Sequence, residues 1–222
     1  VYPQTLKIGA LVMGFGVHPD TGDFFLDANI DSAAGWSNAV RGMDGWGGLP
    51  NHYGMATLAN AEIVEMRFPY QITGRELAPD TGGPGQWRGV CGSRITKQTR
   101  TPMFLNFSAV GRRWPMKGIA GGRDGAPNCW LYDPDGPEQR EETGLGYLVL
   151  FQPGSSWAFQ LGGGGGWGDP LQREPAAVLD DVLDGYVSAE AALRDYGVVL
   201  TADGAGVDSK ATRKEREGRR KG

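Results

Sequence analysis

The chain has 222 residues, of which 40% are hydrophobic, and it contains 37 glycines and 14 prolines. This length suits one sizeable domain, and the many turn-forming residues favour a β-dominated fold over a helical bundle. The net charge of −4 gives no general case for nucleic-acid or membrane binding. Without a signal-peptide pattern or a stretch of about 20 apolar residues, the expected location is cytoplasmic.

The first elements predicted along the chain form a β-hairpin. Leu6 to Phe15 is an apolar, strand-like run. Pro19-Asp20-Thr21-Gly22 has the residues of a reverse turn, and Phe24 and Phe25 begin the next strand.

A long loop follows over Ala33 to Tyr53, which has no helical or strand period. Its two tryptophans and its tyrosine argue against disorder, since aromatic side chains are normally buried. The loop is either the wall of a substrate pocket or subunit interface, or an ordered structural loop. On the first interpretation the candidate binding residues are Trp46, Asn51 and Tyr53.

Strand patterns dominate the middle of the chain. Glu62 to Ile72 is strand-like, with Pro69 indicating an edge position or a bulge, and Ile95 to Val110 suits two more strands. Tyr147 to Phe151 and Trp157 to Leu161 flank Pro153-Gly154 and predict a hairpin. Trp157, Phe159 and Leu161 are expected in the core.

Two smaller motifs lie between these strands. In the glycine-rich stretch after Leu77, Asp80 can pair with Arg88 or cap the turn through its own backbone. Arg112-Arg113-Trp114 predicts a surface cation–π contact. The alternative for this cluster is a ligand site, whereas the Asp80 motif indicates architecture and not catalysis.

Five consecutive glycines, Gly162 to Gly166, precede Trp167. A flexible linker is the alternative, but the run contains no serine and is flanked by apolar residues. We therefore expect it to be packed closely against other backbone, where a side chain would not fit. On this hypothesis Gly164→Val destabilises the fold by roughly 1–3 kcal/mol.

The end of the chain predicts a helical hairpin over about 175–197. Pro175 suits a first helical turn, Gly185 and Gly197 suit left-handed caps, and Ser188 suits an N-cap. The stretch 208–222 has seven Lys/Arg against three Asp/Glu and is expected to be a disordered charged tail. A nucleic-acid-binding arm is the alternative.

No self-sufficient catalytic constellation is visible. The two histidines, His18 and His52, are not at metal-ligand spacing, and no phosphate-binding loop or nucleophile elbow is present. Cys91 has glycine neighbours that could expose a thiolate, but no partner base, so a buried inert thiol is expected. Cys91 and Cys129 are too few for a disulfide framework or a zinc site.

Three segments together resemble the hydantoinase B/5-oxoprolinase family, which includes the large subunits of ATP-dependent ketone carboxylases. They are RFPYQITGRELAPDTGGPGQWRGVCGS (67–93), GGRDGAPNCWLY (121–132) and GGGGGWGDPLQREPAAVLDDVLDGYVSAEAALRDYGVVL (162–200). The resemblance covers roughly Asp44 to Leu200. It implies the carboxy-terminal part of a larger subunit, which agrees with a chain that begins at Val1. The predicted fold class is α+β: a β-rich domain over 1–207 with a carboxy-terminal helical hairpin.

The resemblance also implies a division of labour. A hydantoinase A-like subunit binds ATP, and metal-binding motifs lie in the remaining amino-terminal half of the hydantoinase B-like subunit. This chain alone is expected to bind neither ATP nor a divalent metal and to be inactive. His52 falls where family members often carry a histidine after an Asp-Gly step, here Asp44-Gly45, and is the candidate catalytic residue. Leu58-Ala59-Asn60 departs from the family's usual Asn-Thr-Pro.

Three functions remain open. The departure at Asn60 favours a ketone carboxylase of the acetone or acetophenone type. The alternative enzyme is an ATP-dependent amidohydrolase that opens a hydantoin, lactam or 5-oxoproline ring. The third alternative is a non-catalytic scaffold subunit. The substrate is accordingly a small carbonyl compound or cyclic amide, and neither nucleic acid nor membrane is an expected partner.

Overall fold

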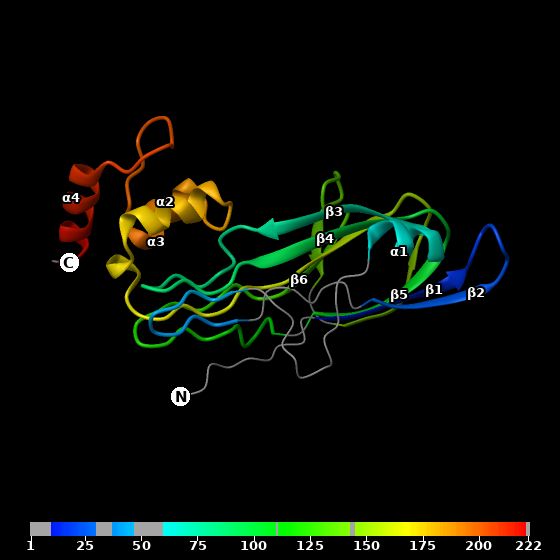
Figure 1. The fold of residues 1–222 in the computed structure, drawn as a ribbon. Helices are drawn as coiled ribbons and strands as arrows, with labels where there is room; N and C mark the ends of the chain where they lie inside the picture. The colour runs from blue at the N-terminus through cyan, green and yellow to red at the C-terminus, as the bar shows by residue number, and fades with distance from the viewer. Residues whose placement is uncertain (1–9, 30–36, 47–59, 110, 143–144, 221–222) are drawn as a thin grey trace.

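The computed structural model describes residues 10–29, 37–46, 60–109, 111–142 and 145–220. Two antiparallel β-sheets form a sandwich, glycine-rich extended segments continue from one end of it, and helices cover that end (Figure 1). The predicted α+β class, β-rich with helices near the carboxy terminus, is confirmed.

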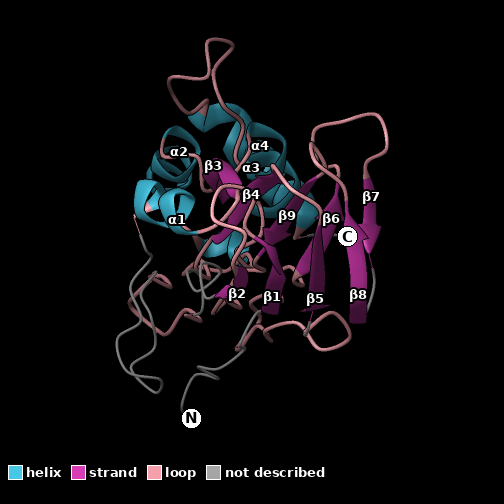
Figure 2. Cartoon of the chain, turned by 90° about the vertical axis from the view of Figure 1, so that its right-hand side faces the viewer, coloured by secondary structure: helices cyan, strands magenta, loops and turns pink. Residues whose placement is uncertain are grey.

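The four-stranded sheet has the order β2-β1-β5-β8 (Figure 2). Its strands are β1 (Ala10–Val17), β2 (Phe24–Asn29), β5 (Met103–Ala109) and β8 (Leu145–Phe151). The predicted first hairpin is confirmed, because β1 pairs with β2 across the turn that contains Gly22.

The five-stranded sheet has the order β3-β4-β9-β6-β7. Its strands are β3 (Tyr70–Ala78), β4 (Gly92–Thr99), β6 (Cys129–Tyr132), β7 (Arg140–Glu142) and β9 (Ser156–Gln160). The two strands predicted within Ile95 to Val110 are β4 and β5, which belong to different sheets.

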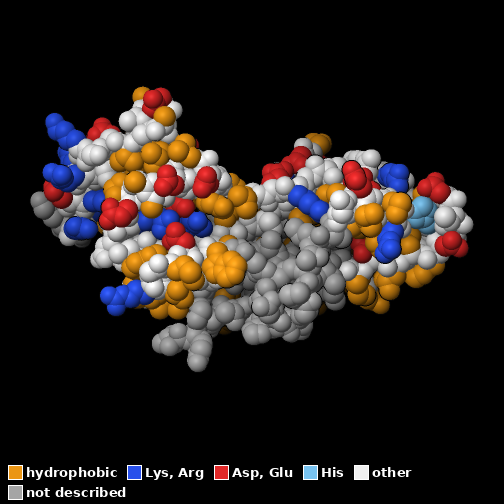
Figure 3. All heavy atoms as spheres, viewed as in Figure 1, with side chains coloured by type: hydrophobic (Ala, Val, Ile, Leu, Met, Phe, Trp, Pro, Cys, Tyr) orange, Lys and Arg blue, Asp and Glu red, His pale blue; other side chains and the backbone are white. Residues whose placement is uncertain are grey.

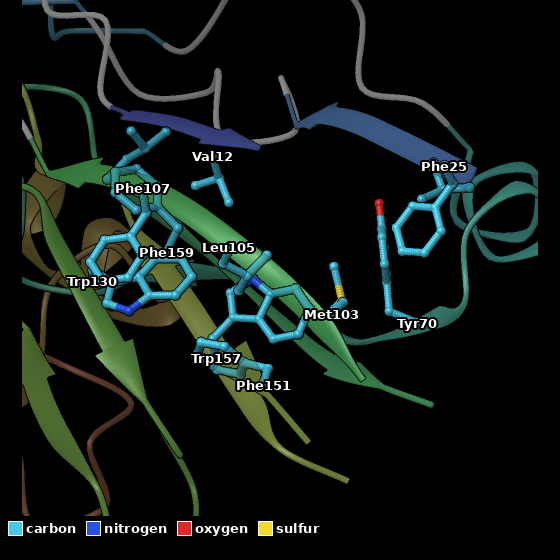
Figure 4. Packing of buried hydrophobic residues seen from close by; sticks show 12 residues of the cluster. Val12, Phe25, Tyr70, Met103, Leu105, Phe107, Trp130, Phe151, Trp157 and Phe159 are labelled. Carbon is cyan, nitrogen blue, oxygen red and sulfur yellow. The ribbon is translucent and has the colours of Figure 1, made fainter. Parts of the chain in front are cut away.

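Aromatic rings fill the space between the sheets (Figure 4). Trp130 stacks on Phe107 with ring centroids 4.2 Å apart, and Phe151 meets Trp157 at 5.4 Å. Trp157, Phe159 and Leu161 are all buried, as predicted. The core also holds one polar link between the sheets, because the Tyr70 hydroxyl on β3 donates to the carboxylate of Asp27 on β2.

Two strand predictions are wrong. β8 and β9 flank the Pro153-Gly154 turn but do not pair: β8 pairs with β5 in one sheet, and β9 pairs with β4 and β6 in the other. The turn therefore carries the chain from one sheet to its partner.

The second wrong prediction concerns the first half of Glu62 to Ile72. Residues Ala61–Arg67 form helix α1, and β3 begins only at Tyr70. The Asn60 side chain caps the helix by accepting from the amide of Glu62 at 2.8 Å. This local cap outweighs the strand-like composition of the segment.

The glycine run forms the centre of a bundle of extended segments, which Figure 1 shows side by side beyond the ends of β3, β4 and β6. Residues 162–168 hydrogen-bond through their backbone to 37–46, 81–90 and 116–126. A Cβ atom added at any of Gly162 to Gly166 would lie 2.0–2.3 Å from a carbonyl oxygen of Ala126, Thr81, Ser37, Lys117 or Pro84 respectively. We call residues 37–46, 81–90, 116–126 and 162–168 the glycine bundle.

Contacts in the glycine bundle repeat every three residues. Gly163 and Gly166 both face the segment that holds Thr81 and Pro84, whereas the intervening glycines face other segments. A three-residue period is typical of the polyproline II conformation, in which the backbone has no internal hydrogen bonds and bonds its neighbours instead. The prediction of a packed run is confirmed, and close approach, not positive φ, is the reason for glycine here.

The predicted helical hairpin is confirmed as α2 (Pro175–Leu183) and α3 (Ala189–Tyr196), preceded by the short 3₁₀ helix η2 (Pro170–Gln172). Ser188 caps α3, and Gly197 ends it with φ +61°. The helices enclose their own core of Val178, Val187, Ala191, Ala192, Tyr196 and Val198.

The expected disordered tail is instead helix α4 (Ser209–Arg219). Asp208 caps the helix, Glu215 and Arg219 form an ion pair one turn apart, and Thr212 is buried. Arg216 donates to the carbonyl oxygens of Tyr196 at 3.0 Å and Arg173 at 2.9 Å. These specific bonds order a segment whose composition alone indicates a solvated tail. Among the helices that the structure describes, none has the length and apolar character needed to cross a membrane.

Candidate functional site

The structure describes one of the four residues predicted for the site. Trp46 ends the segment 37–46, and its side chain is 65% exposed. Asn51, His52 and Tyr53 lie outside the described residues, so the geometry of the predicted catalytic histidine stays a prediction. The described residues do show how the segment leading to them is held.

Segment 37–46 is fixed along the glycine bundle. The amide of Ala39 donates to the carbonyl oxygen of Gly165 at 2.9 Å, and the buried Asn38 side chain accepts from the Gly165 amide at 2.6 Å. Near the other end, the amide of Gly45 donates to the carbonyl oxygen of Arg88 at 2.7 Å. Trp46 therefore leaves the bundle from a fixed backbone position.

Asp44 attaches the same segment to the helices. Its two carboxylate oxygens accept from the two terminal nitrogens of Arg173 at 2.7 and 2.8 Å, a bidentate arrangement. Asp44 also accepts from the Arg88 amide at 2.6 Å. One side chain thus joins the 37–46 segment, the glycine-rich stretch 81–90 and Arg173 at the end of η2.

Asp181 completes the ion network from α2. Its carboxylate lies 2.8 Å from Arg173 and 3.0 Å from Arg88, and the exposed fraction of each of these three side chains is 7% or less. The Arg88 guanidinium also lies over the Tyr186 ring, 4.6 Å from its centroid. We call Asp44, Arg88, Arg173 and Asp181 the anchor network.

Burial and neighbouring charges act in opposite directions on the pKa values of the anchor network. Burial raises the pKa of Asp44, but the hydrogen bond and charge of Arg173 and the contribution of Arg88 lower it more, so the net pKa lies below its usual range. Burial lowers the pKa of Arg173, but Asp44 and Asp181 raise it above its ordinary value. Burial raises the pKa of Asp181 although Arg88 and Arg173 both lower it. The bonds of the network are suited to positioning the segment.

The proposed pair between Asp80 and Arg88 is wrong. Arg88 binds Asp181, and the Asp80 carboxylate accepts from the amide of Ser188 at 2.7 Å. Asp80 has φ +63° and its own amide donates to the Tyr186 carbonyl oxygen, so it fastens the turn between α2 and α3. The motif has the structural role that was predicted, but Asp80 and Arg88 bind other residues and not each other.

The cysteines and the basic-aromatic cluster also have structural roles. Cys91 is buried, its thiol donates to the carbonyl oxygen of Ala78 at 2.9 Å, and burial raises its pKa. This agrees with an inert thiol. Arg113 lies over the exposed ring of Trp114, with 5.6 Å to the centroid, which confirms the surface cation–π contact.

Within the described part of the chain, no group of three or more His, Cys, Asp or Glu side chains is arranged to hold a metal ion. The carboxylates of the anchor network already bind arginine. The residues present there do not fit a divalent metal.

The anchor network is the feature that sequence reasoning missed. Arg173 and Asp44 are 129 positions apart, so no local pattern links them. One signal was present: Asp181 lies three positions after the buried Val178, on the inward face of a short amphipathic helix. A carboxylate buried at such a position is stable only with a hydrogen-bonded cationic partner, so the sequence indicates that one is nearby.

Comparisons with known proteins agree with this architecture. The family model for hydantoinase B/oxoprolinase matches residues 7–170. Caprolactamase subunit beta of Pseudomonas jessenii is 33% identical over 202 residues, which cover 85% of this chain and 33% of the relative. The acetone carboxylase alpha subunit of Xanthobacter autotrophicus is 29% identical over 192 residues, covering 70% of this chain and 25% of the relative.

A solved structure shares the fold. The crystal structure of ATP-dependent caprolactamase from Pseudomonas jessenii superposes with a TM-score of 0.78 at 26% identity, covering 93% of this chain and 37% of the other. The chain thus spans about a third of the length of these relatives, or less.

Proposed function

Because the chain belongs to the hydantoinase B/oxoprolinase family, we propose that it forms part of the hydantoinase B-like subunit of an ATP-dependent enzyme. The enzyme acts on the carbonyl group of a small substrate, with ATP bound by a hydantoinase A-like partner subunit. The names of the relatives support this proposal. A caprolactamase acts on a lactam and an acetone carboxylase acts on a ketone, so both substrates contain a carbonyl group. The caprolactamase whose structure is solved is described as ATP-dependent.

Of the two reaction classes, we propose the opening of a cyclic amide. The observation that carries this choice is the match to caprolactamase subunit beta, which is both longer and more identical than the match to acetone carboxylase. The proposal reverses the sequence-based preference for ketone carboxylation, which depended on the departure at Leu58-Ala59-Asn60. Asn60 caps helix α1, so this departure has a local structural reason.

Ketone carboxylation is kept as the second candidate. A relative that carboxylates acetone matches over 70% of the chain, and fold alone does not distinguish the two chemistries. A non-catalytic scaffold is the third, because the described residues hold no metal cluster.

The contribution proposed for this chain is the placement of residues 46–53. The anchor network and the glycine bundle fix the backbone up to Trp46. On this proposal Trp46, Asn51 and Tyr53 line the substrate site and His52 takes part in the reaction. The supporting observation is that segment 37–46 is held by the buried bond of Asn38 to Gly165 and by the part-buried bonds of Asp44 to Arg88 and Arg173.

The test is ATP hydrolysis by the complete complex, assembled with the remaining hydantoinase B-like polypeptide and the hydantoinase A-like subunit. We expect ε-caprolactam, hydantoin or 5-oxoproline to stimulate ATP hydrolysis without bicarbonate. Stimulation by acetone or acetophenone that requires bicarbonate would select carboxylation instead. If neither class stimulates hydrolysis, the enzymatic proposal fails.

The division of labour has its own test. The isolated 222-residue chain, titrated calorimetrically with MgATP and separately with Mn²⁺ and Zn²⁺, should release no heat of micromolar binding. His52→Asn in the complete complex should then lower kcat for the substrate that stimulates ATP hydrolysis. An unchanged kcat would remove His52 from the reaction.

A further inference from the structure

The four-stranded sheet has an unusual outer face, turned away from the aromatic core. Residues Phe15, Val17, Phe24, Leu26, Phe104, Leu148 and Leu150 project from this side, and we call them the outer apolar face. Six of the seven are exposed, from 39% for Phe104 to 69% for Phe24, and Phe15 is half-buried. Figure 3 shows hydrophobic side chains among charged ones at the right-hand end of the molecule, where Figure 1 places β1 and β2.

Strand register makes this face continuous. Leu26 on β2 lies opposite Phe15 on β1, Phe15 lies opposite Phe104 on β5, and Phe104 lies opposite Leu150 on β8. One apolar row therefore crosses all four strands. The Phe15 and Phe104 rings stack at 5.8 Å, so the row is packed laterally and not scattered.

Charge is absent from the outer apolar face. Asp27 is the only charged residue in β1, β2, β5 and β8, and it points inward to the Tyr70 hydroxyl. An antiparallel sheet with one face in water normally alternates apolar with polar residues. Apart from Asn106 and Ser108 on β5, the outward positions of these strands that the structure describes are apolar, which is the pattern of a sheet that is covered on both faces.

The five-stranded sheet supplies the contrast within the same molecule. On its edge, Gln71 lies opposite Gln98, and Glu76 lies opposite Arg94. That sheet has the polar pairs expected beside water. The outer apolar face differs from it in composition, although both sheets share one core.

The size of the face fits a protein partner. Four strands about 4.8 Å apart, each about six residues long at about 3.4 Å per residue, give a footprint of roughly 400 Å². The largest contiguous apolar patch on a soluble protein is often functional, and interface centres are depleted of charged residues.

We propose that the outer apolar face binds the remaining part of the hydantoinase B-like polypeptide, through an apolar surface of that part. The family relatives indicate this occupant, because they contain about twice as much chain outside the matched region as within it. The proposal depends on family membership and not on the reaction, so it can fail or hold independently of cyclic-amide opening.

To test this, this chain is co-expressed as a separate polypeptide with the sequence that aligns to the other two thirds of caprolactamase subunit beta. The two are kept as separate polypeptides in the experiment, whether or not one sequence naturally continues the other. Size-exclusion chromatography with light scattering should show a 1:1 complex. Phe104→Glu should weaken binding at least about tenfold, because it places a charge in the centre of the row. Leu26→Glu, on another strand, repeats the test if the first variant does not fold.

Leu183→Glu is the matched control. Leu183 is an apolar residue on α2 and is 64% exposed, but it lies on the helices and outside the four-stranded sheet. It should leave binding unchanged, and circular dichroism melts should show that all variants are folded. The proposal is overturned if the wild-type chain does not bind the second polypeptide. It is equally overturned if Phe104→Glu and Leu26→Glu bind as well as Leu183→Glu, or if these changes abolish only self-association of the chain.

Discussion

The glycine bundle and the aromatic core of the sandwich are stabilised in opposite ways. In the core, large rings such as Trp130 and Phe107 fill the space between the sheets, and the backbones stay apart. Along the glycine run 162–166 at the centre of the bundle, side chains are absent and the backbones meet directly, with carbonyl oxygens where a Cβ would be. The core therefore depends on large side chains, and the glycine run at the centre of the bundle depends on having no side chains.

Because of this difference, the residues around a substitution can rearrange more easily in the core than in the bundle. When a core side chain is truncated, neighbouring side chains can change rotamer and fill part of the cavity. The loss of folding free energy therefore depends on how far the surroundings can close around the cavity. In the bundle, Gly164 faces the Ser37 carbonyl oxygen, and that segment is itself bonded on several sides. A backbone held in this way cannot move aside without breaking hydrogen bonds.

The largest expected effect is therefore at Gly164. Alanine suffices, because its Cβ would lie 2.0 Å from the Ser37 oxygen. We expect Gly164→Ala to destabilise the fold by about 4 kcal/mol or more, above the usual cost of overpacking. Denaturant unfolding of the purified chain measures this.

Gly218→Ala is the control for that variant. Gly218 lies in α4 with no atom within 4 Å of an added Cβ, and alanine there should raise stability by up to about 1 kcal/mol. Equal effects of the two alanines would mean that the bundle is no more crowded than a helix surface.

Trp130→Ala tests the contribution of ring packing to the stability of the aromatic core. Trp130 is 1% exposed and stacks on Phe107, so its truncation should cost about 4 kcal/mol or slightly less. Trp130→Phe keeps a ring in the core and should cost much less. If both substitutions shift the unfolding midpoint equally, ring packing is not what stabilises the sandwich.

Arg173→Met should have the next largest effect. It keeps most of the side-chain volume but leaves Asp44 and Asp181 without their shared cation, and we expect a loss of about 3 kcal/mol. Water can reach Asp44, and Arg88 still neutralises Asp181, which places the cost at the low end for a buried pair. The exposed Arg213→Met, on α4, should change stability by less than about 0.5 kcal/mol. A null result for Arg173→Met would show that the network does not join the helices to the bundle.

The smallest expected effect is a pH dependence. The pKa of Asp44 is lower in the folded than in the unfolded chain, so its contribution is present above the unfolded pKa of about 3.9 and is lost as the pH falls through the folded pKa. The stability difference between wild type and Asp44→Asn should thus be larger at pH 7 than at pH 3. Denaturant midpoints at both values measure it, and a difference that does not vary with pH would contradict the assignment.

An element of the fold could be predicted from the sequence when the residues that determine it lie close together in the chain. Ser188 and Gly197 mark the ends of α3 through their own bonds and dihedral angles, so the helical hairpin was predictable. α1 was missed because its apolar residues resemble a strand, although the Asn60 cap was a usable signal. The pairing of β8 was missed because its partner, β5, is far away in the sequence.

The candidate site was less accessible to such reasoning. Nothing near Asp44 in the sequence indicates Arg173 or Arg88 as its partners. Packing of the glycine run could be inferred from its lack of serine, but the segments that contact it come from three separate parts of the chain. Contacts between distant segments are set by the whole fold, and a single sequence read locally does not contain them.

Amide hydrogen exchange at Gly164 and Gly166 tests the central claim most directly. These amides donate to the carbonyl oxygens of Val90 and Arg123, both at 3.0 Å, within a buried bundle. If the bundle and the sandwich form one cooperative unit, both amides should exchange only through global unfolding, as slowly as those of the central strand β5. Exchange at the rate of an unfolded chain, while β5 stays protected, would show that the glycine run is a solvated linker and would contradict the account.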